Sequence, residues 1–133
     1  MGLSKRLMKR TAIADLYTVD GAFVRNRCDI DFIGGGHQLV YPWMPRGEAW
    51  IEATLGSDGR FIAAHELSEI FDMLTRGWSY ERAHAKANRV EKVCRNTHGR
   101  GGGIMIGAVR SIQPRCADVI ADAVRSWPGR DSR

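Results

Sequence analysis

The chain has 133 residues, of which 44% are hydrophobic and 26% are charged, and its formal net charge is +5. These values are ordinary for one globular domain, which we expect over residues 1–133. The sequence contains no internal repeat and no low-complexity segment. No apolar run is long enough to span a bilayer, so no membrane partner is expected.

Basic residues are concentrated in segment 1–10 and near the C-terminus. They permit contact with nucleic acid or an acidic partner but do not require it, and solvated basic ends are the simpler explanation. No apolar block follows the first basic residues, so no signal peptide is expected. The chain has three widely spaced cysteines, Cys28, Cys94 and Cys116. This number and spacing argue against a disulfide framework and favour a reducing compartment, so we expect a cytoplasmic protein.

The first half of the chain carries patterns of short strands after a basic N-terminal segment. Leu3–Arg10 has the pattern of a short amphipathic helix, and Ala12–Val19 has that of a strand. Asp20-Gly21 is a common hairpin turn, so a return strand is expected over Ala22–Arg27.

Three more strands are expected before residue 56. They cover Cys28–Ile33, Gln38–Tyr41 and Glu48–Leu55. Gly34–Gly36 breaks the pattern and is interpreted as a flexible connection. The first half therefore predicts a small antiparallel β-sheet.

The second half is helical. An apolar arc predicts a helix over Arg60–Arg76, and Gly77 is typical of a helix C-terminus. Ser79 is a suitable N-cap for a second helix that continues to Thr97. Ile104–Ile112 is a helix or a strand, Ala117–Trp127 is a last helix, and residues 128–133 form a loose tail. The expected fold class is α+β, with an N-terminal antiparallel sheet packed against a helical hairpin and a C-terminal helix.

The first of these helices contains a pattern that is typical of zinc hydrolases. His65, Glu66 and Glu69 form His-Glu-x-x-Glu, close to the His-Glu-x-x-His signature. Residues four apart lie on one side of a helix, so two of them can reach one metal ion. His84 on the next helix is a candidate third ligand. Zinc is the expected ion, and manganese also accepts such ligands.

These residues resemble the gluzincins, the thermolysin-like zinc metallopeptidases. In that family a strand at the edge of the cleft precedes the active-site helix, and a following helix gives the third ligand. Glu48–Leu55 and the two predicted helices stand in that order. The resemblance implies that His65, Glu69 and His84 bind zinc. It also implies that Glu66 is the general base, which deprotonates the metal-bound water that attacks a peptide or protein substrate. The family has His at the second ligand position and Glu at the third, whereas this chain has them exchanged.

A second interpretation of the helical pair needs no metal. His65 and Glu69 share a polar arc with Ser68 and Asp72, which is typical of the solvent-facing side of a surface helix. The polar groups near the apolar arcs then pair to hold the helices in register, as His84–Glu91 or Glu66 with an arginine. Asp72 and Glu91 are assigned a supporting or structural role under either interpretation.

A second function class also remains open. The small size and the basic ends suit a phage or mobile-element protein that attaches to a protein or nucleic-acid complex. Trp43, Arg46 and Trp50 form a candidate partner surface, because aromatic and basic side chains can stack on a base or a peptide. The same aromatic residues can instead cover the sheet.

Overall fold

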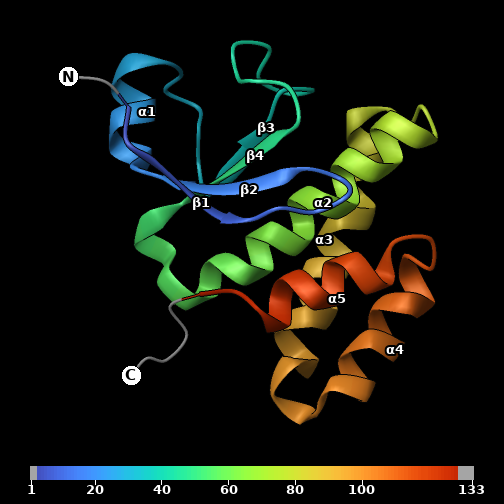
Figure 1. Ribbon diagram of the computed structural model, residues 1–133. Helices are drawn as coiled ribbons and strands as arrows, with labels where there is room; N and C mark the ends of the chain where they lie inside the picture. Colours follow the sequence, from blue (N-terminus) through green and yellow to red (C-terminus); the bar gives the residue numbers. More distant parts are fainter. Residues whose placement is uncertain (1–2, 129–133) are drawn as a thin grey trace.

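The computed structural model describes residues 3–128 and confirms the α+β class (Figure 1). Its elements are β1 (Lys5–Lys9), β2 (Asp15–Val19), α1 (Gly21–Arg27), β3 (Gly35–His37), β4 (Glu48–Glu52), α2 (Gly59–Thr75), α3 (Tyr80–Thr97), α4 (Gly102–Ile112) and α5 (Ala117–Arg125). Short 3₁₀ turns follow β4 and α3. Helices α2 to α5 lie on one side of the sheet, with α2 packed directly against it, and α1 lies on the other side. Within residues 3–128, no helix combines the length and the apolar character that crossing a membrane requires.

The sheet is mixed, so the expected antiparallel meander is wrong. The strand order is β1-β2-β4-β3, and β2 and β4 are parallel while the two outer pairs are antiparallel. The cause lies at Asp20, whose carboxylate accepts hydrogen bonds from the backbone N–H groups of Ala22 and Phe23. Asp20 therefore caps helix α1 where a hairpin was predicted over Asp20–Arg27, and the chain returns to the sheet only at β3.

Three other predictions in the first half are also wrong. Leu3–Arg10 forms strand β1 rather than a helix, because it pairs with β2 along the edge of the sheet. Cys28–Ile33 is irregular, and Ile30 and Ile33 are each 78% exposed. The strand predicted over Gln38–Tyr41 is absent, and these residues form a turn. The strand lies just before them, at Gly35–His37 (β3). The strand predicted over Glu48–Leu55 is present as β4 but ends at Glu52.

The helical hairpin is confirmed almost to the residue. Gly77 has φ = 65°, and the Ser79 hydroxyl accepts a hydrogen bond from the backbone N–H of Arg82. Glycine adopts this left-handed conformation without the steric cost that a Cβ imposes. Ile104–Ile112 falls in helix α4, and the last helix ends at Arg125, two residues before its predicted end. Most of the predicted tail, residues 129–133, lies outside the described part of the chain.

Helix α2 is the centre of the molecule and is buried on nearly all sides. It packs against the sheet, α3 and α5, and 12 of its 17 residues are buried. The main hydrophobic core surrounds it and includes Leu16, Ile51, Leu67, Val90 and Ile120. Leu74 lies in the last turn of α2 and is 61% exposed.

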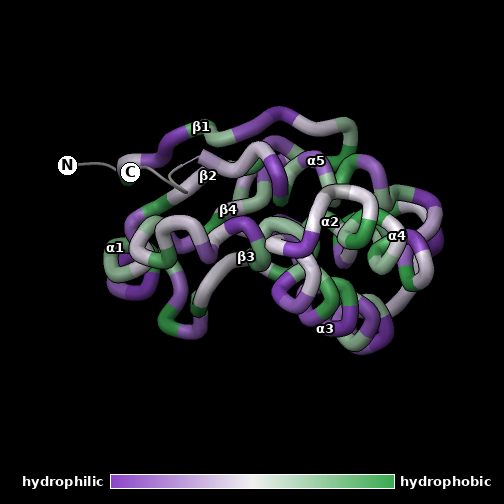
Figure 2. The backbone as a smooth tube through the Cα atoms, turned by 90° about the horizontal axis from the view of Figure 1, so that it is seen from below, coloured by the Kyte–Doolittle hydropathy of each residue, from purple (hydrophilic) through white to green (hydrophobic). Residues whose placement is uncertain are grey.

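Alanines form the buried side of the first half of α3. Ala83 and Ala87 are fully buried, and α2 is the main packing partner of α3. The outward side of α3 is charged, which gives the alternation of hydrophilic and hydrophobic residues seen in Figure 2. Small side chains allow the two helices to approach closely.

A smaller core lies on the opposite face of the sheet. It contains Val19, Val24, Phe32, Met44 and Trp50. Trp50 is only 4% exposed, so its assignment to a partner surface is wrong, and the interpretation that it covers the sheet is correct. Trp43 is 39% exposed and packs on Trp50 and Tyr41, and Arg46 is exposed.

Candidate metal centre

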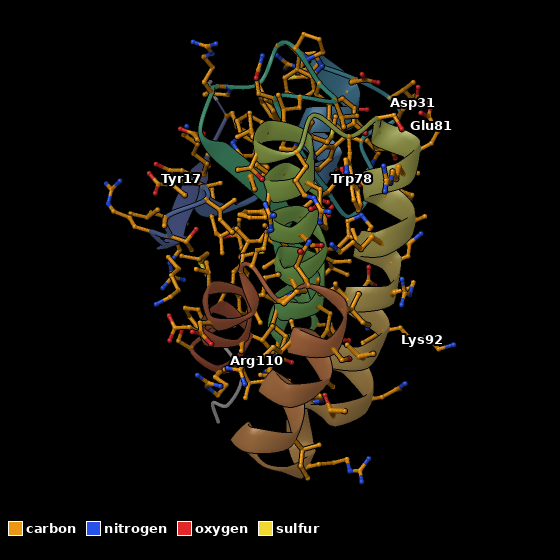
Figure 3. The ribbon with its side chains drawn as sticks, turned by 90° about the vertical axis from the view of Figure 1, so that its right-hand side faces the viewer. Tyr17, Asp31, Trp78, Glu81, Lys92 and Arg110 are labelled. Carbon is orange, nitrogen blue, oxygen red and sulfur yellow. The ribbon has the colours of Figure 1, made fainter. Side chains whose placement is uncertain are left out.

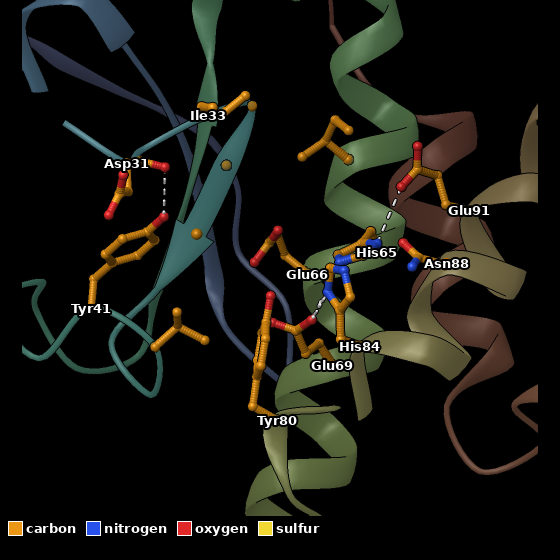
Figure 4. A pocket seen from close by; sticks show the side chains of 15 residues that line it. Asp31, Ile33, Tyr41, His65, Glu66, Glu69, Tyr80, His84, Asn88 and Glu91 are labelled. Carbon is orange, nitrogen blue, oxygen red and sulfur yellow. Dashed lines mark hydrogen bonds and ion pairs between the residues drawn. The ribbon is translucent and has the colours of Figure 1, made fainter. Parts of the chain in front are cut away.

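Helix α2 presents three predicted site residues to a space between β3 and α3 (Figure 4). His65, Glu66 and Glu69 are 7%, 6% and 2% exposed. The interpretation of His65 and Glu69 as a solvent-facing pair is therefore wrong. The polar side of a helix usually faces water. Here α3 and β3 cover that side and place the polar side chains of His84, Glu91 and His37 against it.

The three predicted ligands come together. His84 Nδ1 lies 2.8 Å from Glu69 Oε2, and His65 Nε2 lies 3.3 Å from the same oxygen. One donor atom from each of the three residues lies within 4.8 Å of the other two. Metal–ligand bonds of about 2.0–2.1 Å in a tetrahedron place the donor atoms about 3.3 Å apart. The arrangement therefore fits one ion after small side-chain movements.

Glu91 supports His65 from the next helix. Glu91 Oε1 lies 3.1 Å from His65 Nδ1, and Arg95 donates two hydrogen bonds to Glu91 Oε2. Metal-binding histidines are commonly held in this way, with a carboxylate at the nitrogen that does not face the ion. The supporting role predicted for Glu91 is thus consistent with its position, although its partner is His65 and not His84. His84 contacts Glu69 instead.

His37 is a residue of the cluster that the sequence did not predict. It ends strand β3, is 1% exposed, and its Nε2 lies 2.7 Å from Glu69 Oε1 and 3.8 Å from Glu66 Oε1. His37 lies 32 residues before Glu69, so no motif with a fixed spacing links it to the residues of α2. The only available signal was a histidine directly after Gly34–Gly36.

The glycines before His37 allow β3 to approach α2. A Cβ added at Gly35 would lie 2.8 Å from the Ile62 side chain and from the Trp50 carbonyl oxygen, and 3.5 Å from Glu66 Oε2. The segment interpreted as a flexible connection is therefore an ordered wall of the site. A larger residue would not fit at this position without displacing its neighbours.

The carboxyl groups have different protonation properties because their surroundings differ. Burial alone would raise the pKa of Glu69, but its imidazole neighbours outweigh burial and lower the pKa to about 2. Burial would likewise lower the pKa of His65, but Glu69 and Glu91 raise it to about 10. Burial raises the pKa of Glu66 to about 7, with partial compensation by His65 and His37. Within residues 3–128, Glu66 Oε1 has no hydrogen-bond partner.

The cluster opens into a cavity of about 350 Å³. Gly34–Gly36 and Tyr41 line it on the sheet side, and His65, Glu66, Glu69 and His84 line it on the helix side. Tyr80 also lines the cavity, and burial together with the nearby carboxylates raises the pKa of the Tyr41 and Tyr80 phenols. The cavity is large enough for part of a substrate to reach the cluster.

The remaining predicted residues lie away from this cavity. Asp72 is fully buried and accepts a hydrogen bond from Gln113, with Lys86 at 3.5 Å, so it joins α2 to α3 and to the end of α4. Of the supporting and structural roles predicted for Asp72, these contacts fit the structural one. Trp43 and Arg46 do not line the cavity. Glu81 and Lys92 project outward from α3 (Figure 3).

No protein-family model, curated protein or solved structure matches this chain. The resemblance to gluzincins therefore stays a prediction, carried by His65-Glu66 and by the two helices; the strand that lines the cavity is β3, whereas Glu48–Glu52 lies inside the sheet.

Proposed function

We propose that this chain is a metal-dependent hydrolase in which His65, Glu69 and His84 hold a divalent ion. The supporting observation is that donor atoms from two helices converge at the floor of an open cavity. Two imidazoles and one carboxylate suit Zn²⁺, and Mn²⁺ is the second candidate.

Glu66 is the proposed general base. A bound ion in such a site polarises a carbonyl and lowers the pKa of water. Glu66 lies next to His65 in the chain, lines the cavity, and its carboxyl has a pKa near neutrality because it is buried. A base with this pKa can accept a proton from the attacking water and later release it.

The proposed substrate is a peptide or protein. Strand β3 lies at the edge of the sheet and its glycines line the cavity. An extended peptide can add to such an edge through main-chain hydrogen bonds. The scissile carbonyl would then lie in the cavity beside β3, which Glu66 also lines.

The competing interpretation is a metal-free His–Glu network that holds the helices together in a binding protein. Its candidate partner surface consists of Trp43 and Arg46 only, because Trp50 is buried. Metal content separates the two proposals, because a purely structural network has no need of an ion.

The test is elemental analysis of purified protein and of two histidine variants. We expect at least one zinc or manganese ion per chain, and at least one fewer in His65→Ala. His98→Ala is the matched control, because His98 is exposed and packs on Phe61 outside the cavity. Glu66→Gln should keep the ion held by His65 and lower kcat/KM on quenched fluorescent peptides by about 10²–10⁴-fold. Metal-free wild-type protein, after purification without chelator and addition of Zn²⁺ or Mn²⁺, would contradict the proposal.

A further inference from the structure

We infer that Glu69 bridges two metal ions, the second of which is held by His37 and Glu66. This inference rests on the proposed function, because it assigns the first ion to His65, His84 and Glu69. It adds a second site to the same cluster and gives His37 a role as a ligand.

The two oxygens of Glu69 face two different sets of donors. Oε2 faces the imidazoles of His65 and His84 at 3.3 and 2.8 Å, whereas Oε1 faces His37 Nε2 at 2.7 Å. Donor atoms of His37, Glu66 and Glu69 also lie within 4.8 Å of one another. Glu69 thus belongs to both groups of three donor residues, with one oxygen facing each group. This is the arrangement of a bridging ligand.

Glu66 gives an independent indication of a cation. Its side chain is more than nine-tenths buried, and no residue in the described range 3–128 offers a hydrogen bond to Oε1. This oxygen points into the group formed with His37 and Glu69, and lies 3.8 Å from His37 Nε2. Leaving a buried acceptor unpaired is costly, and two carboxylates in one buried space repel each other. A cation between Glu66, Glu69 and His37 would remove both costs.

A second ion is compatible with the proposed role of Glu66. Glu66 would bind through Oε1, while Oε2, which lies toward Gly35 at the cavity wall, would remain free to accept a hydrogen bond from the attacking water and orient it. In two-metal sites the ions lie about 3.5–4 Å apart and stabilise the attacking and leaving oxygens together. The mixture of imidazole and carboxylate donors suits a pair of Zn²⁺ or Mn²⁺ ions.

The experiment is equilibrium dialysis of chelator-treated, full-length protein against Zn²⁺, followed by elemental analysis. We expect two ions per chain in the wild type and in His98→Ala, and one in His37→Ala. A second measurement uses Mn²⁺, because two ions joined by a carboxylate give a spin-coupled electron paramagnetic resonance spectrum. His37→Ala should replace this with the spectrum of an isolated ion. Circular dichroism checks that the variant is folded.

The outcomes separate the inference from the proposed function. One ion per wild-type chain would overturn the inference and leave the proposed function intact, and no ion would overturn both. Two ions in the wild type with any number other than one in a folded His37→Ala would also overturn the assignment of His37. If His37→Ala does not fold, the wild-type stoichiometry and the Mn²⁺ spectrum still decide the question.

Discussion

Replacing Glu66 by glutamine should stabilise the metal-free protein at alkaline pH. Glu66 is 6% exposed, and burial raises its pKa from 4.5 to about 7. Well below pH 4.5 the carboxyl is protonated in both the folded and the unfolded chain, so it has no effect on stability. Between pH 4.5 and 7 the unfolded chain ionises first, and the free energy of unfolding falls as the pH rises. Above pH 7 the full cost is present.

The size of the effect follows from the two pKa values. At roughly 1.4 kcal/mol per pKa unit, the buried charge costs about 3 kcal/mol at pH 8 and about 1 kcal/mol at pH 5. Glutamine has nearly the same shape and no charge. Glu66→Gln should therefore raise the free energy of unfolding by about 3 kcal/mol at pH 8 and by much less at pH 5.

The assay is urea denaturation in the presence of a chelator at pH 5 and pH 8, followed by circular dichroism. Glu69→Gln is the matched control, because it makes the same chemical change one turn away on the same helix. The pKa of Glu69 is lowered to about 2, so its charge stabilises the folded chain and its loss should be destabilising by about 3 kcal/mol at both pH values. Equal stability of wild type and Glu66→Gln at pH 8, or a lower stability of the variant, would refute the reasoning.

Three more predictions follow from the contacts around the cluster. Glu91→Gln weakens the partner of His65 and should reduce zinc affinity about 10–100-fold in equilibrium dialysis; unchanged affinity would mean that Glu91 does not orient the ligand. Gly35→Ala places a Cβ 2.8 Å from the Ile62 side chain and from the Trp50 carbonyl, and should cost about 1–3 kcal/mol in urea denaturation. An unaltered urea midpoint would show that β3 can move away from α2. Leu67→Ala empties a fully buried position and should cost about 2–5 kcal/mol, and a loss below 1 kcal/mol would place Leu67 outside the core.

The helical half of the fold could be predicted from the sequence because its signals are local. The apolar arcs, Gly77 and Ser79 act within a few residues of the structure that they determine, and the predicted hairpin is present. The sheet was harder, because Asp20-Gly21 can form a hairpin turn or begin a helix. The choice depends on distant contacts such as the hydrogen bond from the Gly21 N–H to Glu52.

The candidate site was predictable only where it depended on helical spacing. His65, Glu66 and Glu69 were recognised by their positions on one helix, and His84 by its place on the next. His37 belongs to a strand whose position depends on the topology of the sheet, so no local pattern could assign it. The burial of the polar side of α2 was missed for the same reason, since the residues that cover it are remote in sequence.

The buried alanines between α2 and α3 have a consequence for the chemistry. Ala83 and Ala87 are fully buried on α3, the helix that carries His84, and the His84 imidazole lies 2.8 Å from the Glu69 carboxylate. Small side chains at these positions let α3 lie close enough to α2 for this contact. A leucine in place of Ala87 would act as a wedge that opens this gap while both helices persist. In the proposed metal centre, the distance between the ligands on α2 and α3 would then depend on the packing of the two helices.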